Sequence, residues 1–314
     1  MSSPIPIFRR KDDGAATVDQ LPIPCTLAEY AADPDNDKWR NWIAHLPARV
    51  AELTARWSLT LGAPYDPGGM CSWVAPARNA DGDDLVLKMG VRHSEGEHEA
   101  DALRFWDGDG AVRLYDAHIT DDTCVLLLER CTPGTSLKQT LPEPEQDEVI
   151  AHLLRRLWKE PSPGHSFRPL QSMCDEWGDE LAENAERNPD TVDSGLVRAG
   201  LEIFRSYAGT SDRHVLLCTD LHGDNVLAAQ RQPWLVIDPK PYVGDPAYDA
   251  SQHMLNCLDR LEAGPRGLCQ RMAALLELEA ERVTTWLFAR CVQESFSGDG
   301  WGQQTARIAP SLAP

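Results

Sequence analysis

Short apolar runs separated by turn residues dominate the first part of the chain, and this pattern predicts a β-sheet. The runs at 71–75 and 84–89 flank a turn cluster at 79–83, so we expect them to form a hairpin. After the hairpin, apolar residues are available for one face of a helix. We expect strands over 71–75, 84–89, 111–115 and 123–128, a helix ending near 61 and a helical segment over 95–106.

The pattern changes after a breaker-rich segment at 131–135, which we expect to be a hinge. Beyond it, apolar residues recur at helical spacing, as Val149, Leu153 and Leu157 do. We expect short strands over 214–217, 226–229 and 234–237, helices over 145–159, 170–187, 193–208, 246–258, 265–277 and 279–296, and a final tail containing Gly and Pro.

Strands followed by helices across a hinge predict an α+β protein of two lobes. We expect the first lobe to be residues 1–130, including an N-terminal extension, and the second to be residues 131–314. The sequence contains no internal repeat and no low-complexity tract.

The bulk composition indicates a cytoplasmic protein. No apolar run approaches the roughly 18 residues that a membrane-spanning helix needs, and the N-terminal segment has no apolar core of a secretory signal. Nine cysteines, with no C-x-x-C pair, favour reduced thiols over a disulfide framework or a zinc site. We therefore expect neither a membrane partner nor structural disulfides.

The charge balance is the informative part of the composition. Thirty basic residues against 49 acidic residues give a net charge of −19, which repels nucleic acid and anionic membranes. Such a surface attracts a polycationic small molecule, although plain solubility accounts for the same number. We expect a small cationic substrate, no nucleic-acid partner, and a monomer or weak dimer.

The stretch CTDLHGDNVL, residues 218–227, contains two aspartates that are candidates for phosphoryl-transfer chemistry. Asp220 has Asn225 five residues later, and Asp238 stands eighteen residues later at the end of an apolar run. A base aspartate, an asparagine and a second aspartate are the parts that kinase-type transfer from a magnesium nucleotide requires. The competing interpretation is two turns rich in Asp and Asn that join short strands.

Two residues upstream complete the set that this chemistry needs. Lys88 ends an apolar run, where a lysine would steady nucleotide phosphates. Glu99 lies four residues before Leu103 on the predicted helix, so it could face inward as the partner of Lys88. Each residue alone is weak evidence, but the ordered set of Lys, Glu, hinge, Asp, Asn and Asp favours ATP- and magnesium-dependent phosphoryl transfer.

From about 57 to 296 the chain resembles the aminoglycoside phosphotransferases, within the branch of streptomycin 6-kinases and hydroxyurea kinases. The segments that carry the resemblance are 86–88, 98–100, 126–130, 220–227 and 234–249. The resemblance implies a bilobal protein-kinase-like fold, with an N-terminal β-sheet lobe carrying one main helix and a mostly helical C-terminal lobe.

The same resemblance implies roles for individual residues. Asp220 would be the catalytic base, Asn225 and Asp238 would bind magnesium, and Asp249 would brace the catalytic loop. Asp224 falls on a loop position without a catalytic role. Cys218 and Thr219 replace the residues that usually precede the base, which changes how the loop is supported. The residues expected on the nucleotide side are Lys88, Glu99, Glu129, Cys131 and Ser72.

We therefore expect an ATP- and Mg²⁺-dependent O-phosphotransferase that confers antibiotic resistance on its host. The expected acceptor is a cationic aminoglycoside of the streptomycin type. The alternatives are a kinase of the same fold acting on hydroxyurea, another antibiotic or a small metabolite, and a nucleotide-binding pseudokinase.

Overall fold

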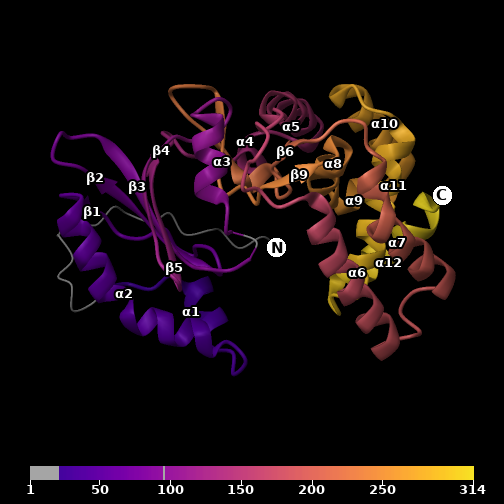
Figure 1. The fold of residues 1–314 in the computed structure, drawn as a ribbon, viewed down its shortest axis with the longest axis horizontal. Helices are drawn as coiled ribbons and strands as arrows, with labels where there is room; N and C mark the ends of the chain where they lie inside the picture. Colours follow the sequence, from indigo (N-terminus) through magenta and orange to yellow (C-terminus); the bar gives the residue numbers. More distant parts are fainter. Residues whose placement is uncertain (1–20, 95) are drawn as a thin grey trace, which may run out of the picture. The chain divides into compact units, whose positions relative to one another are not determined.

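The structure, a computed structural model, describes residues 21–94 and 96–314 (Figure 1). By their internal contacts these residues form two compact units. The first comprises residues up to Arg92 together with Leu114–Arg130, and the second comprises His93–Arg113 together with Cys131–Pro314. In the part of the chain that the structure describes, no helix is long and apolar enough to cross a membrane.

The first unit is built on an antiparallel sheet of five strands in the order β1-β2-β3-β5-β4. The predicted hairpin forms, with Val74 of β2 opposite Lys88 of β3. The strands are β1 (Thr60–Leu61), β2 (Ser72–Arg78), β3 (Asp84–Val91), β4 (Leu114–Ile119) and β5 (Thr123–Glu129).

The prediction of a strand over 111–115 is wrong at its start. The backbone N–H of Val112 donates to Val236 O (3.0 Å), and Ala111 forms an isolated bridge with the same residue, so this end of the segment joins the second unit. Strand β4 begins only at Leu114.

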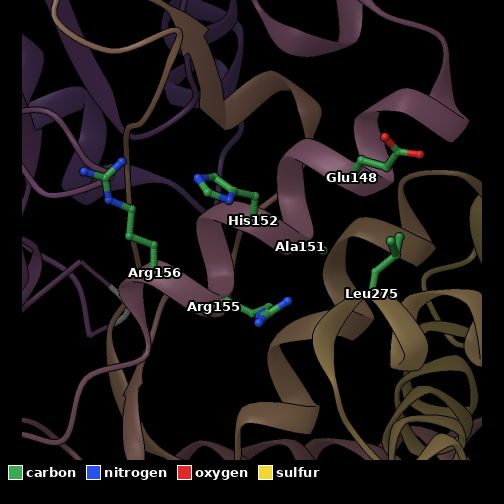
Figure 2. Close-up of a pocket in the computed structure, with 6 residues that line it drawn as sticks. All are labelled: Glu148, Ala151, His152, Arg155, Arg156 and Leu275. Carbon is green, nitrogen blue, oxygen red and sulfur yellow. The ribbon is translucent and has the colours of Figure 1, made fainter.

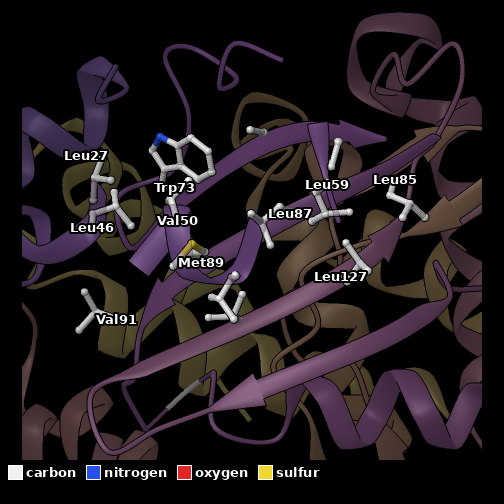
Figure 3. Close-up of a cluster of buried hydrophobic side chains, with 14 of the residues drawn as sticks. Leu27, Leu46, Val50, Leu59, Trp73, Leu85, Leu87, Met89, Val91 and Leu127 are labelled. Atoms are coloured by element: carbon white, nitrogen blue, oxygen red, sulfur yellow. The ribbon is translucent and has the colours of Figure 1, made fainter. Parts of the chain in front are cut away.

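Helices α1 (Cys25–Ala32) and α2 (Asp37–Arg56) supply side chains to the same apolar core as the sheet (Figure 3). Helix α2 buries Trp42, Leu46, Val50 and Leu53, whose spacing of three and four residues places them on one stripe. On β3 the buried Leu85, Leu87 and Met89 alternate with the half-buried Val86 and Lys88. Because side chains alternate along a strand, Lys88 lies on the sheet face opposite this core.

Helix α3 (Glu99–Trp106) belongs by its contacts to the second unit. It begins four residues later than the expected helical segment and ends at Asp107, which has a positive φ of 46°. The Trp106 indole N–H donates to Leu157 O (2.9 Å), which holds α3 against the helix that carries Leu157.

The second unit is mostly helical, and it confirms the predicted order of strands followed by helices. Two short antiparallel pairs, β6 with β9 and β7 with β8, interrupt the helices. The remaining elements are α4 (Leu137–Thr140), α5 (Glu143–Leu157), α6 (Leu170–Arg187), α7 (Ser194–Ser206), β6 (Val215–Leu217), β7 (Val226–Ala228), β8 (Trp234–Val236), β9 (Tyr242–Gly244), α8 (Pro246–Leu255), α9 (Leu258–Ala263), α10 (Pro265–Leu276), α11 (Ala280–Glu294) and α12 (Gly300–Leu312).

The tail containing Gly and Pro, for which the sequence predicted no helix, forms α12 over residues 300–312. The Asp299 side chain caps the helix by accepting the backbone N–H of Gly302 (3.0 Å). Ile308 and Leu312 are buried, and α12 packs against α11. Burial of this apolar stripe outweighs the poor helix propensity of the glycines and of Pro310 in the last turn.

Candidate active site

The loop that follows β6 presents Asp220 at the surface of the second unit. Strand β6 is completely buried, and so is Cys218. Thr219 then adopts a positive φ of 50°, and the Asp220 backbone N–H donates to Cys218 O (2.8 Å). This tight turn leaves the Asp220 side chain 18% exposed at the end of a buried strand.

Asp249, near the start of α8, uses its side chain to hold the backbone of this turn. Its carboxylate accepts the N–H groups of Thr219 (2.6 Å) and Cys218 (3.0 Å). It also accepts the indole N–H of Trp158 (2.9 Å). Burial raises the pKa of Asp249 to about 6, while the three donors favour its ionised form. Asp249 thus braces the loop, as the resemblance implied.

Thr219 supplies a second support that the sequence left open. Its hydroxyl donates to Lys240 O, and the Lys240 N–H donates to Cys218 O (3.0 Å). The departure at 218–219 from the usual residues therefore ties the loop to the segment after β8.

The Asp220 carboxylate has a partner on each oxygen. The Gln252 side-chain amide donates to Oδ1 (2.9 Å), and the Lys240 ammonium lies 3.1 Å from Oδ2. Neither residue was predicted from the sequence to lie in the site. A signal existed for Gln252, because it follows Asp249 by three residues on α8 and so shares its helix face.

Asn225 and Asp238 lie at the same end of the β7–β8 hairpin. Val226 pairs with Val236, and the Ile237 N–H donates to Asn225 O (3.0 Å). The Asn225 side-chain N–H donates to the backbone oxygen of Asp220 (2.9 Å), which leaves its amide oxygen for a cation. An amide oxygen and a carboxylate are hard donors that fit Mg²⁺, which commonly takes one or two protein ligands together with substrate phosphates.

Asp224 has different surroundings from Asp220. Its side chain is 45% exposed and forms an ion pair with Lys138 (2.8 Å) on α4. The backbone N–H of Asp224 donates to the ring of His222, and burial lowers the pKa of His222. Gly223 packs closely against α4, since an added Cβ would lie 3.2 Å from the backbone nitrogen of Lys138. The tripeptide at 222–224 therefore fastens the loop.

The residues expected on the nucleotide side are divided between the two units. Lys88, Ser72 and Glu129 lie on the sheet of the first unit, where Ser72 pairs with Gly90 and Glu129 ends β5. Glu99 and Cys131 belong to the second unit, where Glu99 is buried as the first residue of α3. The pairing of Lys88 with Glu99 and the nucleotide roles of all five residues stay predictions.

The second unit contains a pocket of about 600 Å³ (Figure 2). Its charged groups are neutralised by neighbours, since Arg155 pairs with Glu277 (2.7 Å) and Glu148 with Arg271 (3.4 Å). Its lining contains none of the predicted site residues and consists of Glu148, Ala151, His152, Arg155, Arg156 and Leu275.

Comparison with known proteins identifies relatives over most of the chain. The family model for aminoglycoside/hydroxyurea antibiotic resistance kinases matches residues 56–299. A streptomycin 6-kinase from Streptomyces griseus is 34% identical over 283 residues, which cover 88% of this chain and 91% of the relative. A hydroxyurea phosphotransferase from Kitasatospora aureofaciens is 35% identical over 274 residues, covering 86% and 78% of the two chains.

Among solved structures, a choline kinase from Streptococcus pneumoniae matches with a TM-score of 0.59 at 14% identity. The match covers 86% of this chain and 99% of the choline kinase. At this identity the match shows the fold alone, and it confirms the predicted protein-kinase-like phosphotransferase fold.

Proposed function

The chain belongs to the aminoglycoside/hydroxyurea antibiotic resistance kinase family, and we propose that it transfers the γ-phosphoryl group of ATP to a hydroxyl of streptomycin or a related cationic aminoglycoside. The observation that carries this proposal is the arrangement around Asp220. Gln252 holds the Asp220 carboxylate at the end of β6, and the Asn225 side chain from the same loop donates to the backbone oxygen of Asp220. The phosphorylated antibiotic would bind its target less well, which accounts for resistance.

Asp220 is the proposed catalytic base. Its carboxylate orients the acceptor hydroxyl and accepts the proton late in the transfer, as kinase-type chemistry requires. Gln252 and Lys240 hold the two carboxylate oxygens, so the group that meets the hydroxyl is already oriented. The Lys240 ammonium also offsets negative charge beside the base.

Asn225 and Asp238 are the proposed magnesium ligands. The backbone bond between Ile237 and Asn225 keeps the two ligand positions together at the hairpin end. Magnesium, when bound there with the nucleotide, neutralises charge on the phosphates. Lys88, Glu99, Ser72, Glu129 and Cys131 are proposed to bind the nucleotide itself.

The net charge of −19 favours a cationic acceptor. Hydroxyurea is a second candidate because a hydroxyurea phosphotransferase is similar to this chain at 35% identity. Hydroxyurea is neutral, so it would gain nothing from the acidic surface. The two acceptors are therefore distinguished by their turnover and by its dependence on salt.

The test is ADP release by the purified protein with ATP and Mg²⁺ against a panel of aminoglycosides, hydroxyurea and hydroxylated metabolites. We expect acceptor-dependent release with streptomycin and a loss of that release in Asp220→Ala. Release no higher than that of Asp220→Ala with every acceptor would contradict the enzyme assignment and favour a pseudokinase. Turnover of hydroxyurea alone would replace the proposed acceptor.

A further inference from the structure

Gln252 lies between the proposed base and a buried arginine. Its Nε2 donates to Asp220 Oδ1 (2.9 Å), and its Oε1 accepts from Arg290 Nη2 (3.3 Å). A guanidinium has only donors and an ionised carboxylate has only acceptors. Both neighbours therefore require the same orientation of the Gln252 amide, with its oxygen toward Arg290 and its NH₂ group toward Asp220.

Arg290 is itself held on three sides. It donates to Tyr248 Oη (2.9 Å) and to Glu294 Oε1 (2.6 Å). Its guanidinium carbon also lies 4.1 Å from the centre of the Trp177 ring. Burial alone would lower the pKa of Arg290, but Tyr248 and Glu294 raise it above its ordinary value, so Arg290 remains a charged donor.

A buried arginine at this place costs desolvation energy that an apolar side chain would avoid. Arg290 is 4% exposed, whereas Glu294 at the outer end of the chain of contacts is 22% exposed. The charged Arg290 adds a second restraint on the Gln252 amide, because its N–H engages the amide oxygen while the NH₂ group faces Asp220. An apolar residue at 290 would leave that oxygen without its donor and the amide held by Asp220 alone.

We propose that the chain of contacts from Glu294 through Arg290 to Gln252 sets the rotation of the Asp220 carboxylate, and that Gln252 is a positioning residue for the transfer. With Oδ1 held by Gln252 and Oδ2 beside Lys240, the carboxylate meets the acceptor hydroxyl in one orientation. This inference rests on the proposed function, because it assumes that Asp220 is the base.

The test compares Gln252→Leu with Gln252→Glu on an acceptor that the wild-type protein turns over. Gln252→Leu is expected to lower kcat about 10- to 100-fold, because the carboxylate loses its orientation. The KM for ATP is expected to stay unchanged. Wild-type kcat in Gln252→Leu would overturn the proposal.

Gln252→Glu gives a pH signature that a merely structural role would not produce. A protonated Glu at 252 donates to Asp220 as the amide does, whereas an ionised Glu repels it. Asp220 favours the protonated form of this Glu, whereas Arg290 and Lys240 favour the ionised form. The ratio of the variant's kcat to the wild-type kcat is therefore expected to rise as the pH falls from about 7 toward the ordinary titration range of Glu, at about 4–5. A ratio that is constant with pH would overturn the proposal, and because Glu is nearly isosteric with Gln this arm does not depend on the Leu variant folding.

Gln171→Glu is the matched control. Gln171 also donates to an aspartate, with Nε2 2.8 Å from Asp175 Oδ1, and that aspartate is not among the residues proposed for the transfer. Its kcat ratio is expected to be constant with pH. The carbon-13 chemical shift of the Asp220 carboxyl at one fixed pH adds a readout without substrate, which Gln252→Glu is expected to change and Gln171→Glu is not. Absence of wild-type turnover on every acceptor would refute the proposed function, whereas an unchanged Asp220 carboxyl shift in Gln252→Glu would refute the positioning role alone.

Discussion

Two aspartates four residues apart in one loop have different surroundings, and these surroundings favour Asp220 as the proposed base. Asp220 is mostly buried between Gln252 and Lys240, at the end of a buried strand. Asp224 is half-exposed and paired with Lys138. An oriented carboxylate suits a base, whereas an exposed ion pair contributes little beyond holding the loop.

Asp220→Asn is expected to lower kcat by about 10²- to 10⁴-fold, because the variant has no carboxylate to accept the proton. Asp224→Asn is the matched control in the same loop and is expected to keep most of the turnover. Steady-state ADP release measures both. Loss of turnover in Asp224→Asn with activity kept in Asp220→Asn would show that Asp224, and not Asp220, is the base.

Asn225→Ala is expected to raise the Mg²⁺ concentration needed for half-maximal turnover, because it removes one proposed ligand oxygen. Asn188→Ala, which changes an exposed asparagine at the end of α6, serves as the control. A magnesium titration at saturating ATP gives both values. An unchanged magnesium requirement in Asn225→Ala would remove Asn225 from the metal site.

Spacing along the chain predicted Asp220, Asn225 and Asp238 as site residues because all three lie in one short stretch of sequence. It did not find Gln252, whose contact with Asp220 spans 32 residues and depends on how α8 packs. Lys240 follows Asp238 by two residues, but the sequence gave no reason to predict its contact with Asp220, because a lysine after a strand is usually solvated. Local motifs are therefore readable from the sequence, whereas the groups that orient them depend on tertiary structure.

Within the helices of the second unit, two buried carboxylates behave in opposite ways. Burial raises the pKa of Asp249 to about 6. Burial also acts on Asp147, but hydrogen bonds from His253, Arg260 and Arg271 outweigh it and hold the pKa of Asp147 below its usual range. Neighbouring cations thus make the difference between the two sites.

The raised pKa of Asp249 predicts a pH-dependent stability. Between pH about 4 and about 6 the folded state binds more protons at this site than the unfolded state, so its contribution falls as the pH rises. Asp249→Asn cannot titrate, so the free energy of unfolding of the wild type should fall relative to this variant by up to about 3 kcal/mol over that window. Urea unfolding at several pH values measures the difference. A constant difference would contradict the raised pKa.

Asp147→Asn is expected to lower the free energy of unfolding by about 1.5–3 kcal/mol, because it weakens the charge-assisted hydrogen bonds that the buried Asp147 carboxylate accepts from Arg260 and Arg271. Glu148→Gln changes the next residue, whose side chain is 66% exposed, and should cost less than about 1 kcal/mol. Chemical denaturation of both variants measures the effect. Equal small losses would show that the cluster adds nothing to stability.

Helical periodicity was reliable where the apolar stripe was continuous, as in α6 and α11, which agree with their predicted spans. It failed for α12, where glycines and Pro310 obscured a stripe that only burial against α11 reveals. The short apolar run at 111–115 likewise gave the wrong start for strand β4, because the pairing of Ala111 and Val112 with Val236 is a long-range contact. Pairing partners and packing surfaces lie outside what a local pattern records.

For the molecule as a whole, the net charge of −19 bears on the choice of acceptor. We expect kcat/KM for streptomycin to fall as the salt concentration rises, because salt screens attraction between the acidic protein and the cationic acceptor. Kinetics between about 0.01 and 0.5 M salt measure this effect, with a neutral hydroxylated acceptor as the comparison. The same dependence for both acceptors would remove charge from the explanation of specificity.

The most direct measurement is phosphorus-31 NMR of streptomycin incubated with ATP, Mg²⁺ and the purified protein. We expect a new phosphomonoester resonance coupled to a carbinol proton of the antibiotic, and we expect it to grow about 10²- to 10⁴-fold more slowly with Asp220→Asn. ADP and inorganic phosphate without a phosphorylated antibiotic, or the same product formed at the wild-type rate by Asp220→Asn, would contradict O-phosphotransfer with Asp220 as the base.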